Sequence, residues 1–98
     1  MEFYKFCVGL CPFCNGQGIL IPVQINNEEI HFVCSEAYHE FESFKHIKKR
    51  KTCAPNFDDR SISFDEFIAK FPHLKEHTYI FNEEDMRWVN LINPDKTL

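Results

Sequence analysis

Three cysteines and the spacing between them constrain the fold of this chain more than any other feature. A Pro-Phe pair separates Cys11 from Cys14, and nineteen further residues separate Cys14 from Cys34. A two-residue gap lets both sulfurs of a C-x-x-C turn point at one ion, and zinc takes about four ligands in a tetrahedron. Gly16 and Gly18 follow the second cysteine and favour a tight turn, because glycine readily adopts positive φ. The pattern predicts a turn that supplies two ligands and a later segment that supplies a third.

The residues between Cys14 and Cys34 predict a β-hairpin. Residues 19–25 and 30–34 are rich in apolar and β-branched side chains, and an Asn-Asn-Glu turn separates them. Such a hairpin returns Cys34 to the neighbourhood of the C-x-x-C turn. The apolar run over residues 3–8 predicts a further short strand.

This arrangement resembles a zinc ribbon, in which two C-x-x-C knuckles hold one ion. The first knuckle and the distance to Cys34 match the C-x2-C-x15-20-C portion of that pattern. The second knuckle is degenerate, because the chain reads C-S-E-A from Cys34 and lacks the fourth cysteine. The resemblance covers residues 7–41. The aromatic-rich start, the C-P-x-C turn and the Gly-Gln-Gly segment are also similar to small bacterial proteins of the immunity type.

Several residues are candidates for the missing fourth ligand. His39 ranks first, since it follows Cys34 in a C-x4-H spacing, and Cys53 ranks second; Cys7 lies just upstream of the first knuckle. His31 is excluded, because side chains three positions apart on a strand point to opposite faces. The predicted ligands of a structural zinc ion are Cys11, Cys14, Cys34 and His39. The alternatives are a relic site that binds nothing, or cysteines that serve only as small buried residues.

The rest of the chain predicts mainly helical structure. Apolar side chains at helical spacing predict a helix over residues 35–49. Ser63 begins a capping box ahead of a second helix that stops at Pro72. A short strand is expected over residues 79–81, and Asn82 is placed to cap a last helix with an acidic first turn.

We therefore predict an α+β fold in a single domain spanning residues 1–98. Residues 1–34 form a zinc-ribbon-like β-hairpin or small antiparallel sheet, and two or three α-helices in the mainly helical residues 35–98 pack with it. Eleven Phe supply a core. A chain this short gains limited stability from burial alone, so a bound metal would help to hold it together.

The chain has the features of a cytoplasmic protein. No segment approaches the roughly 20 apolar residues that cross a bilayer, and the start has an early acid and no apolar stretch typical of a secretory signal. Thiols stay reduced in the cytoplasm, so five cysteines indicate metal binding or free thiols rather than disulfides. We expect no membrane partner.

The net charge of −4 is unevenly distributed. Five of the eleven basic residues fall within seven positions: Lys45, Lys48, Lys49, Arg50 and Lys51. The remaining six basic residues stand against fifteen acidic ones. Most of the surface should therefore attract a cationic partner and repel nucleic acid. The candidate partner-binding residues are Glu28, Glu29, Glu36, Glu40, Glu83, Glu84, Asp85 and Trp88.

The sequence does not predict an enzyme. No nucleophile stands beside a base in a recognisable pattern, and we expect no small-molecule substrate. Residues 7–14 match the C-x3-C-x-aromatic-C motif of radical SAM enzymes. Those enzymes resemble partial or full α/β barrels of roughly 200 residues, and this chain lacks both that length and the repeating βα pattern, so we do not expect that activity.

The preferred interpretation is a protein-binding module, and specifically an immunity-type inhibitor that neutralises a basic bacterial toxin domain. A small acidic protein without catalytic residues suits capture of a basic toxin, because opposite charges speed the encounter. The alternative is a nucleic-acid-binding zinc ribbon that uses the basic run over residues 45–51.

Overall fold

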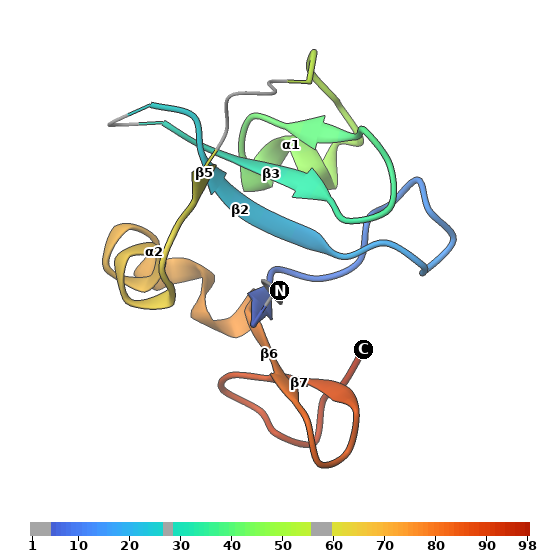
Figure 1. The fold of residues 1–98 in the computed structure, drawn as a ribbon, viewed down its shortest axis with the longest axis vertical. Coiled ribbons are helices and arrows are strands. Elements are labelled where there is room, and N and C mark those ends of the chain that lie inside the picture. Colours follow the sequence, from blue (N-terminus) through green and yellow to red (C-terminus); the bar gives the residue numbers. More distant parts are fainter. Residues whose placement is uncertain (1–4, 27–28, 56–59) are drawn as a thin grey trace.

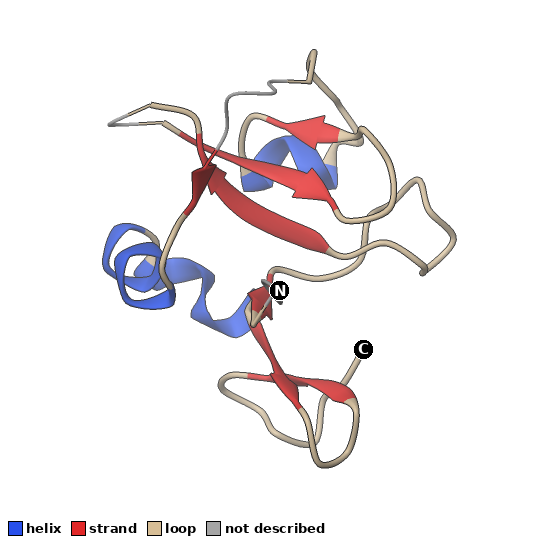
Figure 2. Cartoon of the chain, in the orientation of Figure 1, coloured by secondary structure: helices blue, strands red, loops and turns tan. Residues whose placement is uncertain are grey.

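The computed structural model describes residues 5–26, 29–55 and 60–98. Within these residues the chain forms two small antiparallel sheets and three helical segments (Figures 1 and 2). The predicted α+β fold is confirmed. Residues 3–4 of the first predicted strand lie outside the described residues.

The larger sheet is built around the predicted hairpin. Its inner strands are β2 (Leu20–Gln24) and β3 (Ile30–Cys34), which pair antiparallel over their whole length. Two short strands flank them in the order β4-β3-β2-β5: β4 (Glu40–Phe41) and β5 (Arg60–Ser61). The hairpin is therefore confirmed, and it brings the end of β3 back to the start of β2.

The smaller sheet joins the two ends of the chain. β1 (Phe6–Cys7) pairs with β6 (Tyr79–Asn82), which pairs with β7 (Arg87–Asn90). The strand predicted over residues 79–81 is confirmed. The β6–β7 hairpin extends away from the larger sheet in Figure 1.

The prediction of a last helix after Asn82 is wrong, because the chain turns back there and forms the strand β7 instead. The Asn82 side-chain oxygen accepts hydrogen bonds from the backbone N–H groups of Glu84 and Asp85, at 3.0 and 3.3 Å. These local bonds resemble those of a helix cap, but here they close a hairpin turn in which Met86 has a φ of 54°. The pairing of β7 with β6 supplies the backbone hydrogen bonds that a helix would otherwise provide.

The helix predicted over residues 35–49 is present only near its end, as α1 (Phe44–Lys48). The backbone N–H of Cys34 donates to the His39 carbonyl at 2.9 Å, which closes a loop and leads into β4. Pairing of β4 with β3 therefore overrides the local helical pattern. Four strands lie between residues 35 and 98 in the described part of the chain, so this region is not mainly helical.

The second predicted helix is confirmed as α2 (Phe64–Lys70). The Ser63 hydroxyl accepts a hydrogen bond from the Glu66 backbone N–H at 3.2 Å, as the capping box predicts. Pro72 ends this helix and begins the 3-10 helix η1 (Pro72–His77). No helix in the described part of the chain has both the length and the apolar character that a bilayer crossing requires.

The aromatic core lies on one face of the larger sheet. Phe32 and Phe41 stand opposite each other on β3 and β4 and are fully buried with Phe67 of α2. Phe67 contacts both Phe32 and Phe6, with ring centroids 6.3 and 5.5 Å apart. Because strand side chains alternate between faces, Glu40 points to the opposite face from Phe41.

Candidate metal centre

The C-x-x-C turn folds back on itself through local hydrogen bonds. The backbone N–H of Cys14 donates to the Cys11 carbonyl at 3.4 Å, and that of Gln17 donates to the Cys14 carbonyl at 2.9 Å. Gly16 has a φ of 82°, as a tight turn requires. The Cys11 N–H donates to the Gly18 carbonyl at 2.9 Å and closes the loop. Both sulfurs of the turn are therefore held on a short, well-bonded segment.

The four predicted ligands meet at this turn. Cys34 comes from the end of β3, and His39 comes from the loop before β4. The Cys14 and Cys34 sulfurs lie 3.2 Å apart, and His39 Nδ1 lies 3.5 Å from Cys11 Sγ and 3.6 Å from Cys14 Sγ. All four ligand atoms lie within 4.8 Å of one another.

These separations suit a tetrahedral ion. With zinc–sulfur and zinc–nitrogen bonds of normal length, neighbouring sulfurs lie about 3.8 Å apart and sulfur–nitrogen pairs about 3.6 Å apart. The two measured sulfur–nitrogen distances match that expectation, and Cys14 and Cys34 need separate only slightly. The four side chains therefore lie in an arrangement that could hold a metal ion.

The surroundings shift the pKa values of the three thiols in different directions. Burial raises the pKa of the Cys11 thiol. The hydrogen bond with Cys34, followed by burial, raises the pKa of Cys14 to about 12. Burial also acts to raise the pKa of Cys34, but the Glu36 backbone N–H and the Cys14 thiol outweigh it and lower that pKa. A divalent cation would favour the thiolate form of all three.

Gly18 is required by contact with the sulfurs rather than by its backbone conformation. Only Gly9 and Gly16 have positive φ among the glycines of the chain, so the expectation of positive φ at Gly18 is wrong. A Cβ atom at Gly18 would collide with Cys34 Sγ and lie 3.3 Å from Cys14 Sγ. The absence of a side chain here makes room for the ligands.

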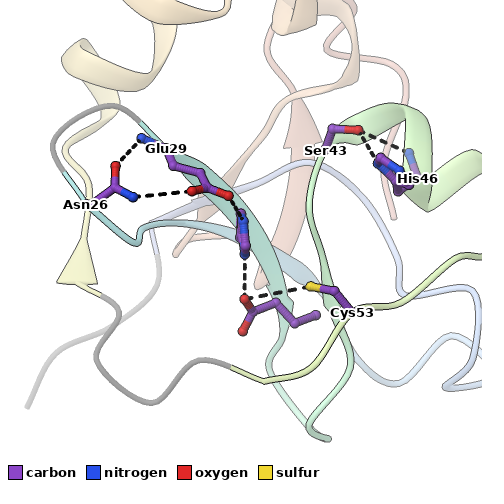
Figure 3. A network of polar contacts seen from close by, with 7 residues as sticks. Asn26, Glu29, Ser43, His46 and Cys53 are labelled. Atoms are coloured by element: carbon purple, nitrogen blue, oxygen red, sulfur yellow. Dashed lines mark hydrogen bonds and ion pairs between the residues drawn. The ribbon is translucent and has the colours of Figure 1, made fainter.

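The other cysteine and histidine candidates lie elsewhere. Cys7 is fully buried, and burial raises its pKa to about 12. His31 and Cys53 belong to a second group of metal-ligand types, together with Glu40, whose ligand atoms also lie within 4.8 Å of one another. Figure 3 shows Cys53 in this network. The prediction that His31 does not belong to the first site is consistent with this grouping. The sequence did not indicate the second group, because the segment that carries Glu40 was predicted as a helix and not as the strand β4.

The predicted partner-binding residues do not gather in one place. Glu40 is 2% exposed and contacts His31, so its assignment as a partner-binding residue is wrong. Glu28 lies outside the described residues. Trp88 is half-buried against Phe81, with ring centroids 5.2 Å apart. The exposed members come from three segments: Glu29 at β3, Glu36 in the loop after β3, and Glu83, Glu84 and Asp85 in the β6–β7 turn.

Comparison of the chain with protein-family models, with curated proteins and with solved structures gave no match. The interpretation of the site therefore rests on its own geometry.

Proposed function

We propose that this chain is a non-enzymatic protein-binding module whose hairpin is held by a structural zinc ion, and specifically an immunity-type inhibitor of a basic toxin domain. The observation that carries the proposal is the convergence of four protein ligands at one point. Four such ligands complete a zinc tetrahedron and leave no position for water or substrate. A site of this kind stabilises a scaffold and performs no reaction.

The β6–β7 hairpin supports the binding role. Its turn carries three consecutive exposed acids, Glu83, Glu84 and Asp85. Met86 directly follows them and is 72% exposed. Acidic side chains would attract a basic partner, and the adjacent Met86 side chain would be covered on contact.

The test is co-expression with a basic toxin domain encoded beside this chain. We expect restored growth and a stable complex of the purified proteins. Reversing all three acids of the turn to Lys should slow association at low salt by about 10-fold or more. The matched control reverses three exposed acids outside the turn: Asp65, Glu76 and Asp95. Equal loss in both triple variants, failure to protect, or measured turnover of a substrate would reject the proposal.

A nucleic-acid-binding role is the second candidate, and one observation favours it. The residues that end and follow α1 are all exposed: Lys48, Lys49, Arg50 and Lys51. They can equally be a solvated helix end, where cations complement the helix dipole. Retention on single-stranded nucleic acid at moderate salt would support the second candidate, particularly if reversal of residues 48–51 abolished it. A protein-binding module should instead pass through the nucleic-acid column without being retained.

A further inference from the structure

His31, Glu40 and Cys53 lie on three neighbouring extended segments of the larger sheet. His31 is in the middle of β3, Glu40 is on β4, and Cys53 forms an isolated antiparallel bridge with Glu40. The Cys53 backbone N–H donates to the Glu40 carbonyl at 2.9 Å, which fixes the third segment against the second. The backbone therefore holds an imidazole, a carboxylate and a thiol side by side.

The side chains converge on the face opposite the aromatic core. His31 Nδ1 lies 2.5 Å from Glu40 Oε2, and Cys53 Sγ lies 4.0 Å from the same oxygen. His31 is 7% exposed and Glu40 is 2% exposed, and the neighbours on this face of β2 are the buried Ile21 and Val23. Buried ionic groups add little net stability compared with apolar residues of similar size. A role in stability alone does not account for this group.

Glu29 holds the other nitrogen of the same imidazole. Its carboxylate lies 2.6 Å from His31 Nε2. Asn26 in turn positions Glu29: its amide donates to the Glu29 carboxylate at 3.2 Å, and its side-chain oxygen accepts from the Glu29 backbone N–H at 2.9 Å. Figure 3 shows Asn26, Glu29 and Cys53 along this chain of contacts. A carboxylate on the far nitrogen of a ligating His is the usual support of a metal site.

We propose that His31, Glu40 and Cys53 bind a second divalent metal ion of the zinc class, with Glu29 as the residue that positions the imidazole. The ligand atoms are His31 Nδ1, one Glu40 oxygen and Cys53 Sγ, a mixed set that zinc accepts. The metal ion replaces the hydrogen bond between His31 and Glu40. On metal binding, the protons of Nδ1 and of the thiol pass to solvent. Nε2 keeps its own proton and donates it in the hydrogen bond to the Glu29 carboxylate.

The second site differs from the first in ligands and openness. The first has three sulfurs and one nitrogen from protein, whereas the second has one sulfur, one nitrogen and one oxygen. Three protein ligands leave a fourth position for water or for a group from a partner. The second site goes beyond the proposed inhibitor role and does not depend on it.

The first experiment counts metal ions. The metal-free chain is dialysed against zinc, and bound metal is measured by elemental analysis. We expect about two ions per parent chain, about one in Cys53→Ser or His31→Asn, and about one in Cys14→Ser. The exposed His73→Asn is the matched control and should keep both. One ion in the parent, or an unchanged count in Cys53→Ser, would overturn the proposal in favour of a purely hydrogen-bonded network.

A cobalt titration of the parent tests the second site without relying on variants, which could fail to fold. A site with three thiolates gives stronger sulfur-to-cobalt absorption than a site with one, so the parent should fill in two spectroscopically distinct steps. Glu29→Gln should keep both steps but weaken the single-thiolate step about 10- to 100-fold. The exposed Glu84→Gln, in the β6–β7 turn, is its matched control and should leave both affinities unchanged. A single step in the parent would overturn the second site.

Discussion

His39 and Glu40 are consecutive residues whose side chains enter two separate groups of metal-ligand types. His39 Nδ1 lies 3.5 Å from Cys11 Sγ, whereas Glu40 Oε2 lies 2.5 Å from His31 Nδ1. Adjacent side chains on extended backbone point to opposite faces, so a single short segment can serve both groups. Both candidate sites therefore depend on the conformation of the chain where it enters β4, at His39 and Glu40.

Cys14→Ser should make the stability of the chain much less sensitive to chelators than that of the parent, because it removes a ligand of the first site and leaves the second site intact. A structural ion bound only by the folded state adds about 3 kcal/mol to the free energy of unfolding when free zinc exceeds its dissociation constant about 100-fold. The parent should lose at least this amount on chelation, measured by denaturant unfolding with and without a chelator. Cys53→Ser keeps all four ligands of the first site. Its free energy of unfolding should therefore still fall on chelation by most of the amount seen in the parent. An equal response of the parent and Cys14→Ser would contradict a structural metal.

Gly18→Ala should weaken zinc binding by at least about 10-fold, because the added Cβ collides with Cys34 Sγ and displaces a ligand. Gly16→Ala is the matched control. Its φ of 82° makes alanine unfavourable by about 1–2 kcal/mol, but nothing lies within 4 Å of the added Cβ. Gly16→Ala should therefore lower stability while zinc affinity changes less, as competition with a chromophoric chelator would show. The reverse order of affinities would exclude the proposed ligand geometry.

His39→Cys should preserve the first site with four sulfurs, whereas His39→Asn should lose one ligand. The cobalt spectrum reports the number of thiolates, so sulfur-to-cobalt absorption should rise in His39→Cys relative to the parent. Cys53→Ser should leave the absorption of the three-thiolate site unchanged. A change of that absorption in Cys53→Ser, with none in His39→Cys, would identify Cys53 as the fourth ligand instead.

Zinc affinity at the first site should increase with pH. Burial raises the pKa of Cys11, and the contact with Cys34 raises that of Cys14, so both hold protons near neutral pH without a metal. Binding must release these protons, and each released proton changes the apparent affinity about 10-fold per pH unit. Release of the protons of Cys11 and Cys14 alone gives a rise of about 100-fold between pH 6 and 7, measured by chelator competition. A flat profile would show that the thiols are already ionised before the metal binds.

Met86→Gly should stabilise the chain by roughly 0.5–1 kcal/mol. Met86 has a φ of 54° in the β6–β7 turn, which glycine adopts without strain, and its side chain is 72% exposed. In a helix over the same residues, glycine would instead cost about 1 kcal/mol relative to alanine. Met86→Ala should accordingly be less stable than Met86→Gly in thermal unfolding. The opposite order would favour the helix that the sequence alone predicts.

The sequence by itself determined the features that depend on near neighbours. The C-x-x-C turn, the hairpin that returns Cys34 to it, and the Ser63 cap of α2 all follow from residues close together in the chain. His39 as the nearest available ligand followed from the same local spacing. These elements form because turn residues, alternating strands and capping side chains act over only a few positions.

Only the tertiary structure decided where local patterns yield to distant pairing. The segment before α1 reads as a helix, yet its backbone hydrogen bonds go to β3 and form β4. Asn82 reads as a helix cap, yet the strand after it pairs with β6. The group of His31, Glu40 and Cys53 exists because two strands and a bridged extended segment meet side by side, and residues that meet through such pairing leave no periodic signal in the sequence.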